Sequence, residues 1–455
     1  MRNGGDRSPA RPAGIDREAV SSLRAARVST HDKALPPDCW GLTVDDVVAR
    51  RLRRSQLPTP LLTLSERDVA ANLELLSGWV ADRGLHLAPH GKTTMAPQLW
   101  ARQLAAGAWG ITLANLSQLA VARSFAVGRV MVANLVLSPL GLRWLAAELA
   151  RADSFSVSVW ADSVAAVRLM DEALAGADQP LPRPLDVLVE LGGPGGRTGA
   201  RDLTTALEVA RAIAAAQHLR LVGVAGYEGA LAHDSDPASL AVIRDYLSAM
   251  VAVHEAVAGQ ALYPADVVPV VTAGGSAYFD VVAEVLGPLA AQGVEVVLRS
   301  GAYLVHDDGF YRHISPVGER PRTSGGRLTS AMHGWVRVTS QPEPGTAIFD
   351  AGKRDLPFDE GLPTVQRRFP VGPAGAAGGP SEGTVLEGVT VSALNDQHGF
   401  LSFPADRPAP VVVGDELRLG LSHPCTAFDK WGLIPVLDDA AADDPVVVDL
   451  IRTYF

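Results

Sequence analysis

Cysteine is the rarest residue in this 455-residue chain, which contains only Cys39 and Cys425. Two thiols are too few for a disulfide framework or for a structural zinc site with four cysteines. The sequence also lacks any apolar run of about 18 residues, so no segment is predicted to span a membrane. The N-terminal residues are charged and rich in proline and glycine, without the apolar centre of a secretory signal, so we expect a cytoplasmic protein.

An excess of positive charge is missing as well. The chain has 40 lysines and arginines against 50 acidic residues, a formal net charge of −10. A nucleic-acid partner is not expected, because phosphate binding needs clustered basic residues. The hydrophobic share of 47% is typical of a globular protein, and the length allows a large barrel with an appended domain.

Eight short apolar segments alternate with helical segments in the first two thirds of the chain. Their nearly continuous apolar character suits parallel strands buried on both faces. The predicted strands are residues 85–89, 109–114, 129–134, 156–161, 186–191, 221–226, 268–273 and 294–299. This alternation predicts an α/β fold, a (β/α)8 barrel of the TIM type, although an open doubly wound sheet would show the same pattern.

The helical pattern stops near residue 325, and short alternating segments follow. They predict a second, mostly β domain with a glycine-rich insertion over residues 371–383. A strand predicted at residues 60–65 exceeds the eight of the barrel and is assigned to this second domain. The predicted division is a disordered tail over 1–40, a segment joining the β-domain over 41–64, the barrel over 65–320 and the β-domain over 321–455.

A lysine follows the first predicted barrel strand, in the sequence HGKT. Catalytic residues of such barrels gather at the C-terminal ends of the strands, where Lys92 would lie. The sequence around Lys92 is not a phosphate loop, because that motif needs a glycine five positions before Gly91 and His86 stands there. From the local sequence alone, an ordinary surface lysine and a functional one are equally good interpretations.

Two later turns are rich in glycine. The turn over residues 191–200 fails as a dinucleotide fingerprint, and its Arg197 could pair with a carboxylate or phenolate oxygen if the turn is more than a tight connection. The turn over residues 272–278 follows the seventh strand, where barrels bind phosphate at helix N-termini. We favour phosphate binding by Gly274, Gly275 and Ser276 over a plain helix cap at this turn.

His423 and Cys425 are two positions apart in the predicted β-domain. In an extended segment their side chains would project from the same face, as metal ligands do. A buried cysteine beside an unrelated histidine is the alternative, because two ligands do not close a metal site. Waters or nearby groups could complete an open centre, and Asp396 and His398 are candidates, although both are also ordinary turn residues.

The order of these motifs resembles the D-serine dehydratase and D-threonine aldolase family. The resemblance covers residues from about 57 to 440 and includes a G-Y-x-G segment at residues 226–229. It implies the alanine-racemase type of fold, in which a barrel that binds pyridoxal phosphate carries a β-domain. A homodimer is expected from the resemblance alone.

The resemblance also implies a role for each motif. Lys92 would be the catalytic Schiff-base lysine, and Arg197 would act beside it or beside the phenolic oxygen of the cofactor. His423 and Cys425 would hold a divalent metal, for which zinc suits the mixed ligands. Family members commonly carry an arginine where this chain has Ala88, so that contact must be absent or replaced. The remaining expected cofactor-binding residues are His90, Tyr227, Gly274, Gly275 and Ser276.

These roles predict a lyase that acts on a β-hydroxy D-amino acid of the D-serine or D-threonine type. Lys92 would take the Cα proton while the metal helps the β-hydroxyl group to leave, and the products would be a 2-oxo acid and ammonia. Retro-aldol cleavage to glycine and an aldehyde is the alternative, but aldolases in the resemblance tend to carry aspartate where this chain has Cys425. A non-catalytic pyridoxal-phosphate carrier is another alternative, and it would need no metal pair.

Overall fold

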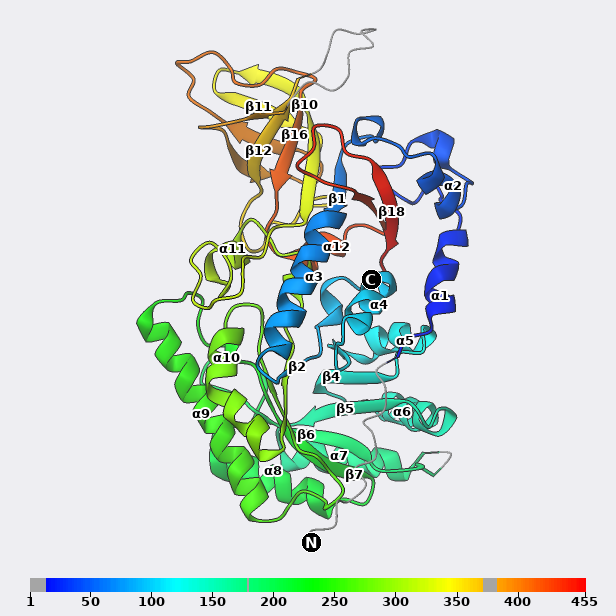
Figure 1. The fold of residues 1–455 in the computed structure, drawn as a ribbon, viewed down its shortest axis with the longest axis vertical. Helices are drawn as coiled ribbons and strands as arrows, with labels where there is room; N and C mark the ends of the chain where they lie inside the picture. The colour runs from blue at the N-terminus through cyan, green and yellow to red at the C-terminus, as the bar shows by residue number, and fades with distance from the viewer. Residues whose placement is uncertain (1–13, 178–179, 371–382) are drawn as a thin grey trace.

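The computed structural model describes residues 14–177, 180–370 and 383–455, which form two sheets (Figure 1). One sheet has eight strands and the other has ten. In Figure 1 the barrel strands lie in the lower part of the molecule, and the second sheet stands above them. The predicted combination of a barrel and a mostly β domain is confirmed.

The eight-stranded sheet is parallel and runs in the order β2-β9-β8-β7-β6-β5-β4-β3. Backbone hydrogen bonds from Trp109 N–H to the Leu87 carbonyl (2.7 Å) and from Thr112 N–H to the Pro89 carbonyl (2.9 Å) join β3 to the end of β2. The sheet therefore closes, and the open doubly wound alternative is wrong. Its strands are β2 (His86–Leu87), β3 (Ile111–Leu113), β4 (Arg129–Leu135), β5 (Ser156–Ala161), β6 (Leu185–Leu191), β7 (Leu219–Gly226), β8 (Val270–Ala273) and β9 (Glu295–Leu298).

Alternate side chains of the barrel strands enter two different cores. Val157 and Val159 of β5 join the large core beneath the helices, whereas Trp160 joins a separate interior cluster with Met131 and Ala88. Figure 1 shows helices around the outer face of the barrel. They are α3 (Glu66–Ala81), α4 (Pro97–Ala105), α5 (Leu116–Ser124), α6 (Pro139–Arg151), α7 (Val164–Ala175), α8 (Leu203–Ala215), α9 (Pro237–Gly259) and α10 (Phe279–Leu286). Within the described residues, no helix is both long enough and apolar enough to cross a membrane.

The second sheet includes a strand from the N-terminal side of the barrel. Strand β1 (Leu61–Ser65) pairs antiparallel with β10 and parallel with β17, and α3 follows it directly into the barrel. The sequence did not predict β12, β13, β15 or β17. Strands β13 and β15 are short and β12 carries several polar residues, whereas β17 is apolar and was missed although it contains no polar residue. The remaining strands are β10 (Met332–Glu343), β11 (Thr346–Phe349), β12 (Thr364–Phe369), β13 (Thr384–Val385), β14 (Thr390–Leu394), β15 (Gly399–Ser402), β16 (Glu416–Gly420), β17 (Leu433–Leu437) and β18 (Val447–Arg452).

The disordered tail predicted over residues 1–40 is wrong for residues 14–40. This segment forms α1 (Arg17–Ser22) and two short 3-10 helices, and α2 (Val44–Ala49) follows it. Val28, Leu35 and Cys39 are buried in a core shared with the second sheet. These apolar residues are too irregularly spaced to show a helical or strand period. Residues 1–13, and the predicted insertion except Gly383, lie outside the described residues.

Gly223 offers a test of how closely barrel strands approach one another. A Cβ atom at this position in β7 would lie 1.9 Å from the carbonyl oxygen of Val270 in β8. We expect Gly223→Ala to lower the free energy of unfolding by about 1–3 kcal/mol or more, because a backbone atom cannot move aside as a side chain can. Urea unfolding measures the change.

Gly78 is the matched control, because it lies in the exposed part of α3 and a Cβ atom there meets nothing within 4 Å. Gly78→Ala should raise stability by up to about 1 kcal/mol, since alanine favours a helix more than glycine does. If Gly223→Ala proved as harmless as Gly78→Ala, the close packing of β7 on β8 would be contradicted.

Candidate active site

One cavity of about 550 Å³ lies at the C-terminal ends of the barrel strands, beneath residues of the second domain. Apart from Asp396 and His398, every residue that the sequence singled out as catalytic, cofactor-binding or metal-binding lines this cavity. They come from segments far apart in the chain, and they are His90, Lys92, Arg197, Tyr227, Gly274, Gly275, Ser276, His423 and Cys425.

Lys92 lies on a short 3-10 helix (Gly91–Thr93) that follows β2. Gly91 is required beside it, because a Cβ atom at Gly91 would lie 2.8 Å from both Trp100 and Ile111. Burial lowers the pKa of Lys92, and Arg197 and Arg299 lower it further against the opposing effect of Cys425. A lysine with a lowered pKa has more of the neutral amine that a nucleophile or base needs.

Arg197 and Tyr227 lie face to face in the cavity. The guanidinium carbon of Arg197 is 4.6 Å from the centre of the Tyr227 ring, within the range of a cation–π contact. The N–H of Tyr227 donates to the Tyr246 hydroxyl at 3.0 Å, which fixes the backbone at the end of β7. Burial raises the pKa of Tyr227, so its phenol stays protonated at neutral pH.

The glycine turn after β8 differs from the phosphate cradle that the sequence predicted. The N–H groups of Gly274 and Gly275 donate to the buried carboxylate of Glu228, at 2.9 and 2.8 Å. These two donors are therefore engaged within the protein, and the glycines give the cavity its shape. Ser276 has no hydrogen-bond partner among the described residues, so its hydroxyl and N–H are available to an anion.

The metal segment is a helix start and not the extended strand that the sequence predicted. Pro424 is the first residue of α12 (Pro424–Phe428), and His423 before it has a left-handed backbone with φ of 48°. The helix nevertheless keeps the two side chains close enough for each to shift the pKa of the other, and both line the cavity. The thiol donates to the Thr93 hydroxyl at 3.6 Å, which connects it to the lysine segment.

A carboxylate orients His423 from the side away from the cavity. Nδ1 of His423 lies 2.5 Å from Asp359, whose other oxygen accepts the Thr426 hydroxyl at 2.6 Å. Burial alone lowers the pKa of His423, but the thiol of Cys425 and the carboxylate of Asp359 raise it to about 9. Histidines that bind metals are commonly held in this way by a carboxylate on the second ring nitrogen. Asp359 was not predicted, because it lies 64 positions away in the sequence.

Asp396 and His398 are not near the pair, and their suggested part in a metal site is wrong. They lie in the turn between β14 and β15 and line a separate surface depression with Lys353. In the ranges that the structure describes, no group of three or more histidine, cysteine or acidic side chains is arranged to hold a metal. A metal on His423 and Cys425 would need water or substrate as further ligands.

Two charged residues of the cavity, Arg299 and Glu190, were missed. Arg299 is fully buried below Trp160 and donates to the Thr272 hydroxyl (2.7 Å) and the Gly226 carbonyl (2.5 Å). One oxygen of buried Glu190 accepts the Thr198 hydroxyl at 2.9 Å. Both missed residues lie at the C-terminal ends of predicted strands, which is the signal that could have identified them.

Buried polar atoms without partners show that the cavity is built for a ligand. The second oxygen of Glu190 and Nδ1 of His90 are buried and have no hydrogen-bond partner among the described residues. Burial lowers the pKa of His90 and the charge of Lys92 lowers it further, so the imidazole is neutral. Burial raises the pKa of Glu190 to about 7. Unpartnered buried groups are costly, and a polar ligand would satisfy them.

Comparisons with known proteins show which enzymes this chain is similar to. Residues 331–437 match the family model described as a putative serine dehydratase domain. D-threonine aldolase of an Arthrobacter species is 26% identical over 392 residues, which cover 86% of this chain and 92% of that enzyme. D-threo-3-hydroxyaspartate dehydratase of Delftia sp. (strain HT23) is 26% identical over 398 residues, which cover 86% of this chain and 96% of that enzyme. The resemblance drawn from the sequence is confirmed.

Solved structures of such enzymes share the fold. D-threonine aldolase from Filomicrobium marinum superposes with a TM-score of 0.70 at 24% identity, over 89% of this chain and 97% of that one. A histidine-to-alanine variant of D-threo-3-hydroxyaspartate dehydratase has a TM-score of 0.68 at 21% identity, over 90% of this chain and 98% of that one. A cysteine-to-alanine variant of that dehydratase was solved in a metal-free form, and its substituted position is two residues after the histidine.

Glu190 gives the site a measurable dependence on pH. An unfolded glutamate titrates near pH 4.3, whereas burial raises the pKa of Glu190 to about 7 in the folded protein. The folded state binds more protons between these values, so stability is lost as the pH rises from about 4 to about 7. We expect Glu190→Gln to remove this loss, on the order of 3–4 kcal/mol. Urea unfolding of both proteins across this range measures it, and parallel curves would contradict the burial of a protonated Glu190.

Proposed function

We propose that this chain, a relative of D-threonine aldolase and D-threo-3-hydroxyaspartate dehydratase, is a pyridoxal-phosphate- and metal-dependent lyase that dehydrates β-hydroxy D-amino acids. One observation carries the proposal: a lysine with a lowered pKa and an imidazole–thiol pair share a single cavity at the top of a barrel. D-serine and D-threonine are the expected substrate types, and a 2-oxo acid and ammonia the expected products. A homodimer in the cytoplasm stays a prediction.

The cavity residues fit pyridoxal phosphate. Lys92 would attach it, Tyr227 would contact its ring, and Arg197 would lie near its phenolic oxygen. Ser276, whose polar groups are free, would bind the phosphate, and the unpartnered atoms of His90 and Glu190 would gain polar neighbours. When bound, the cofactor withdraws electrons from the substrate Cα.

The protein's own groups would then move the proton. The amine of Lys92, once freed from the cofactor, would be the base that takes the Cα proton, and its lowered pKa raises the share of the neutral form that a base needs. Arg197 and buried Arg299 place positive charge on the same side of the cavity, so anionic groups of a ligand are favoured there. Both arginines also oppose reprotonation of the lysine.

His423 and Cys425 would hold the metal, and Asp359 would orient the imidazole. The mixed nitrogen and thiolate donors favour zinc. A divalent ion at an open site acts as a Lewis acid toward a hydroxyl group. Thr93, which accepts a hydrogen bond from the Cys425 thiol at 3.6 Å, keeps the pair next to Lys92, so that Cα and Cβ of one substrate can be served together.

Retro-aldol cleavage is the second candidate, because relatives of both kinds are known. The ligand types favour dehydration. The dehydratase variants replaced a histidine and a cysteine two positions apart, and the cysteine variant was solved in a metal-free form. His423 and Cys425 have the same residue types and the same spacing.

Lys92→Ala tests cofactor attachment. We expect the variant to lose the visible absorbance of lysine-bound cofactor and at least about a thousandfold of the activity, since both attachment and proton transfer need the amine. Lys353→Ala, at an exposed position outside the cavity, is the control and should keep both. Retained absorbance in Lys92→Ala would contradict the proposed attachment.

Cys425→Ala tests the metal. The variant should retain cofactor absorbance while its bound metal, measured by elemental analysis, and its activity both fall by about tenfold or more. Assays with D-serine and D-threonine measure 2-oxo acid, ammonia, glycine and aldehyde separately in the parent protein. Unchanged metal and activity would overturn the ligand role, and aldehyde with equal glycine but no ammonia would overturn the choice of dehydration.

A further inference from the structure

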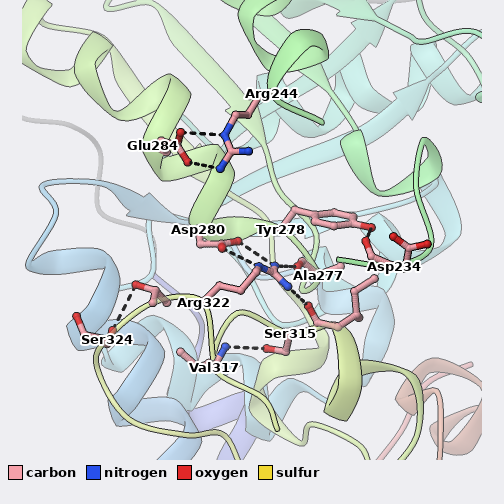
Figure 2. A network of polar contacts seen from close by, with 12 residues as sticks. Asp234, Arg244, Ala277, Tyr278, Asp280, Glu284, Ser315, Val317, Arg322 and Ser324 are labelled. Carbon is pink, nitrogen blue, oxygen red and sulfur yellow. Dashed lines mark hydrogen bonds and ion pairs between the residues drawn. The ribbon is translucent and has the colours of Figure 1, made fainter. Parts of the chain in front are cut away.

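The turn that carries Ser276 is held by hydrogen bonds on two sides. On the inner side, the Glu228 carboxylate accepts the N–H groups of Gly274 and Gly275. On the outer side, the guanidinium of Arg322 donates to the carbonyl oxygen of Ala277 at 2.6 Å (Figure 2). The residue that would meet the cofactor phosphate thus lies between two fixed points.

Arg322 connects this turn to two other segments. Its guanidinium makes a two-point ion pair with Asp280 in the first turn of α10, at 3.0 and 3.1 Å. It also donates to the carbonyl of Ile314, at 2.7 Å. Ile314 ends α11 (Phe310–Ile314), and Phe310 and Tyr311 at the start of this helix line the active-site cavity.

The environment of Arg322 makes these contacts firm. The side chains of Arg322 and Asp280 are 16% and 14% exposed, so little water screens their ion pair. All three guanidinium nitrogens donate, and a planar fork with several partners resists rotation. Two of the partners are the carbonyl oxygens of Ala277 and Ile314. A shorter or uncharged side chain at position 322 would leave both without this donor.

We propose that Arg322 is a positioning residue. It holds the turn of residues 274–277, where the cofactor phosphate would bind, in a fixed position relative to α11. Through Ala277 it fixes the position of Ser276, and through Ile314 it fixes α11, whose Phe310 and Tyr311 also line the cavity. Its loss lets these two parts of the lining move relative to one another, and the affinity for pyridoxal phosphate falls. This inference rests on the proposed function, since it concerns the same cofactor.

The tests are Arg322→Ala and Arg322→Lys, each prepared without cofactor and titrated with pyridoxal phosphate. We expect the dissociation constant to rise about tenfold or more in Arg322→Ala, and Arg322→Lys to recover part of it, because lysine keeps the charge but cannot reach every partner. At saturating cofactor, the activity of Arg322→Ala should return to near that of the parent protein. A change that only lowered stability would not produce this split between affinity and activity.

Arg244 of α9 offers a matched control, because it also forms an ion pair with an acidic residue of α10. It pairs with Glu284 in α10 at 2.9 and 3.1 Å, one turn beyond Asp280, and Figure 2 shows both ion pairs together. The side chains of Arg244 and Glu284 are 43% and 55% exposed, and among the described residues this pair makes no hydrogen bond to the turn or to α11. Arg244→Ala should therefore leave cofactor affinity unchanged.

Asp280→Asn provides a second route if Arg322→Ala does not fold. It keeps both carbonyl contacts of Arg322 and weakens only the ion pair, so the dissociation constant should rise about threefold, a value between those of the parent protein and Arg322→Ala. Parent-like affinity in a folded Arg322→Ala or in Asp280→Asn would overturn the positioning role. Failure of the proposed function is a different result, since the parent protein itself would then not take up the cofactor on Lys92.

Discussion

The assembly of the active site depends on one buried carboxylate, that of Asp307. One of its oxygens accepts the N–H groups of Gly309, Tyr311 and Arg312, at 3.0, 2.9 and 3.4 Å. Its other oxygen accepts the N–H of His423 at 3.2 Å, where the chain adopts a left-handed conformation that non-glycine residues rarely take. Both oxygens of the Asp307 carboxylate therefore accept hydrogen bonds. One holds the start of α11, whose Phe310 and Tyr311 line the cavity, and the other holds His423 at the start of α12.

The charges inside the cavity are unbalanced in a way that an anionic ligand would correct. Arg197 and Arg299 act on Lys92 from the barrel side, and burial adds to their effect in lowering its pKa. Among the acidic residues of the lining, buried Glu190 has a raised pKa and is largely uncharged below neutral pH. A phosphate group or a substrate carboxylate would therefore meet positive charge in this cavity, and the same surroundings favour the neutral form of Lys92 more than water does.

The sequence predicted those features that depend on local periodicity. The eight barrel strands are apolar on both faces, so their positions and order could be read directly, and strand ends then located Lys92 and Arg197. The fold of residues 14–40 could not be read, because burial of their scattered apolar side chains depends on a sheet formed by distant segments. The same holds for Asp359, which meets His423 only through the tertiary fold. Arg299 differs from these residues, because it is the last residue of the predicted strand 294–299 and its position alone indicates a place in the site.

The turn at residues 274–276 shows that a glycine motif alone does not reveal which backbone N–H groups are free to bind a ligand. Glycines before a helix indicate free N–H groups for phosphate, yet the carboxylate of Glu228 takes two of these groups and brings negative charge to the site. The positive charge of buried Arg299 offsets the negative charge of Glu228, so the turn stays compatible with an anion. Under the proposed function the anion would then be held by Ser276, next to the Ala277 carbonyl that accepts a hydrogen bond from Arg322. Anion binding here depends as much on the residues that hold the turn as on the turn itself.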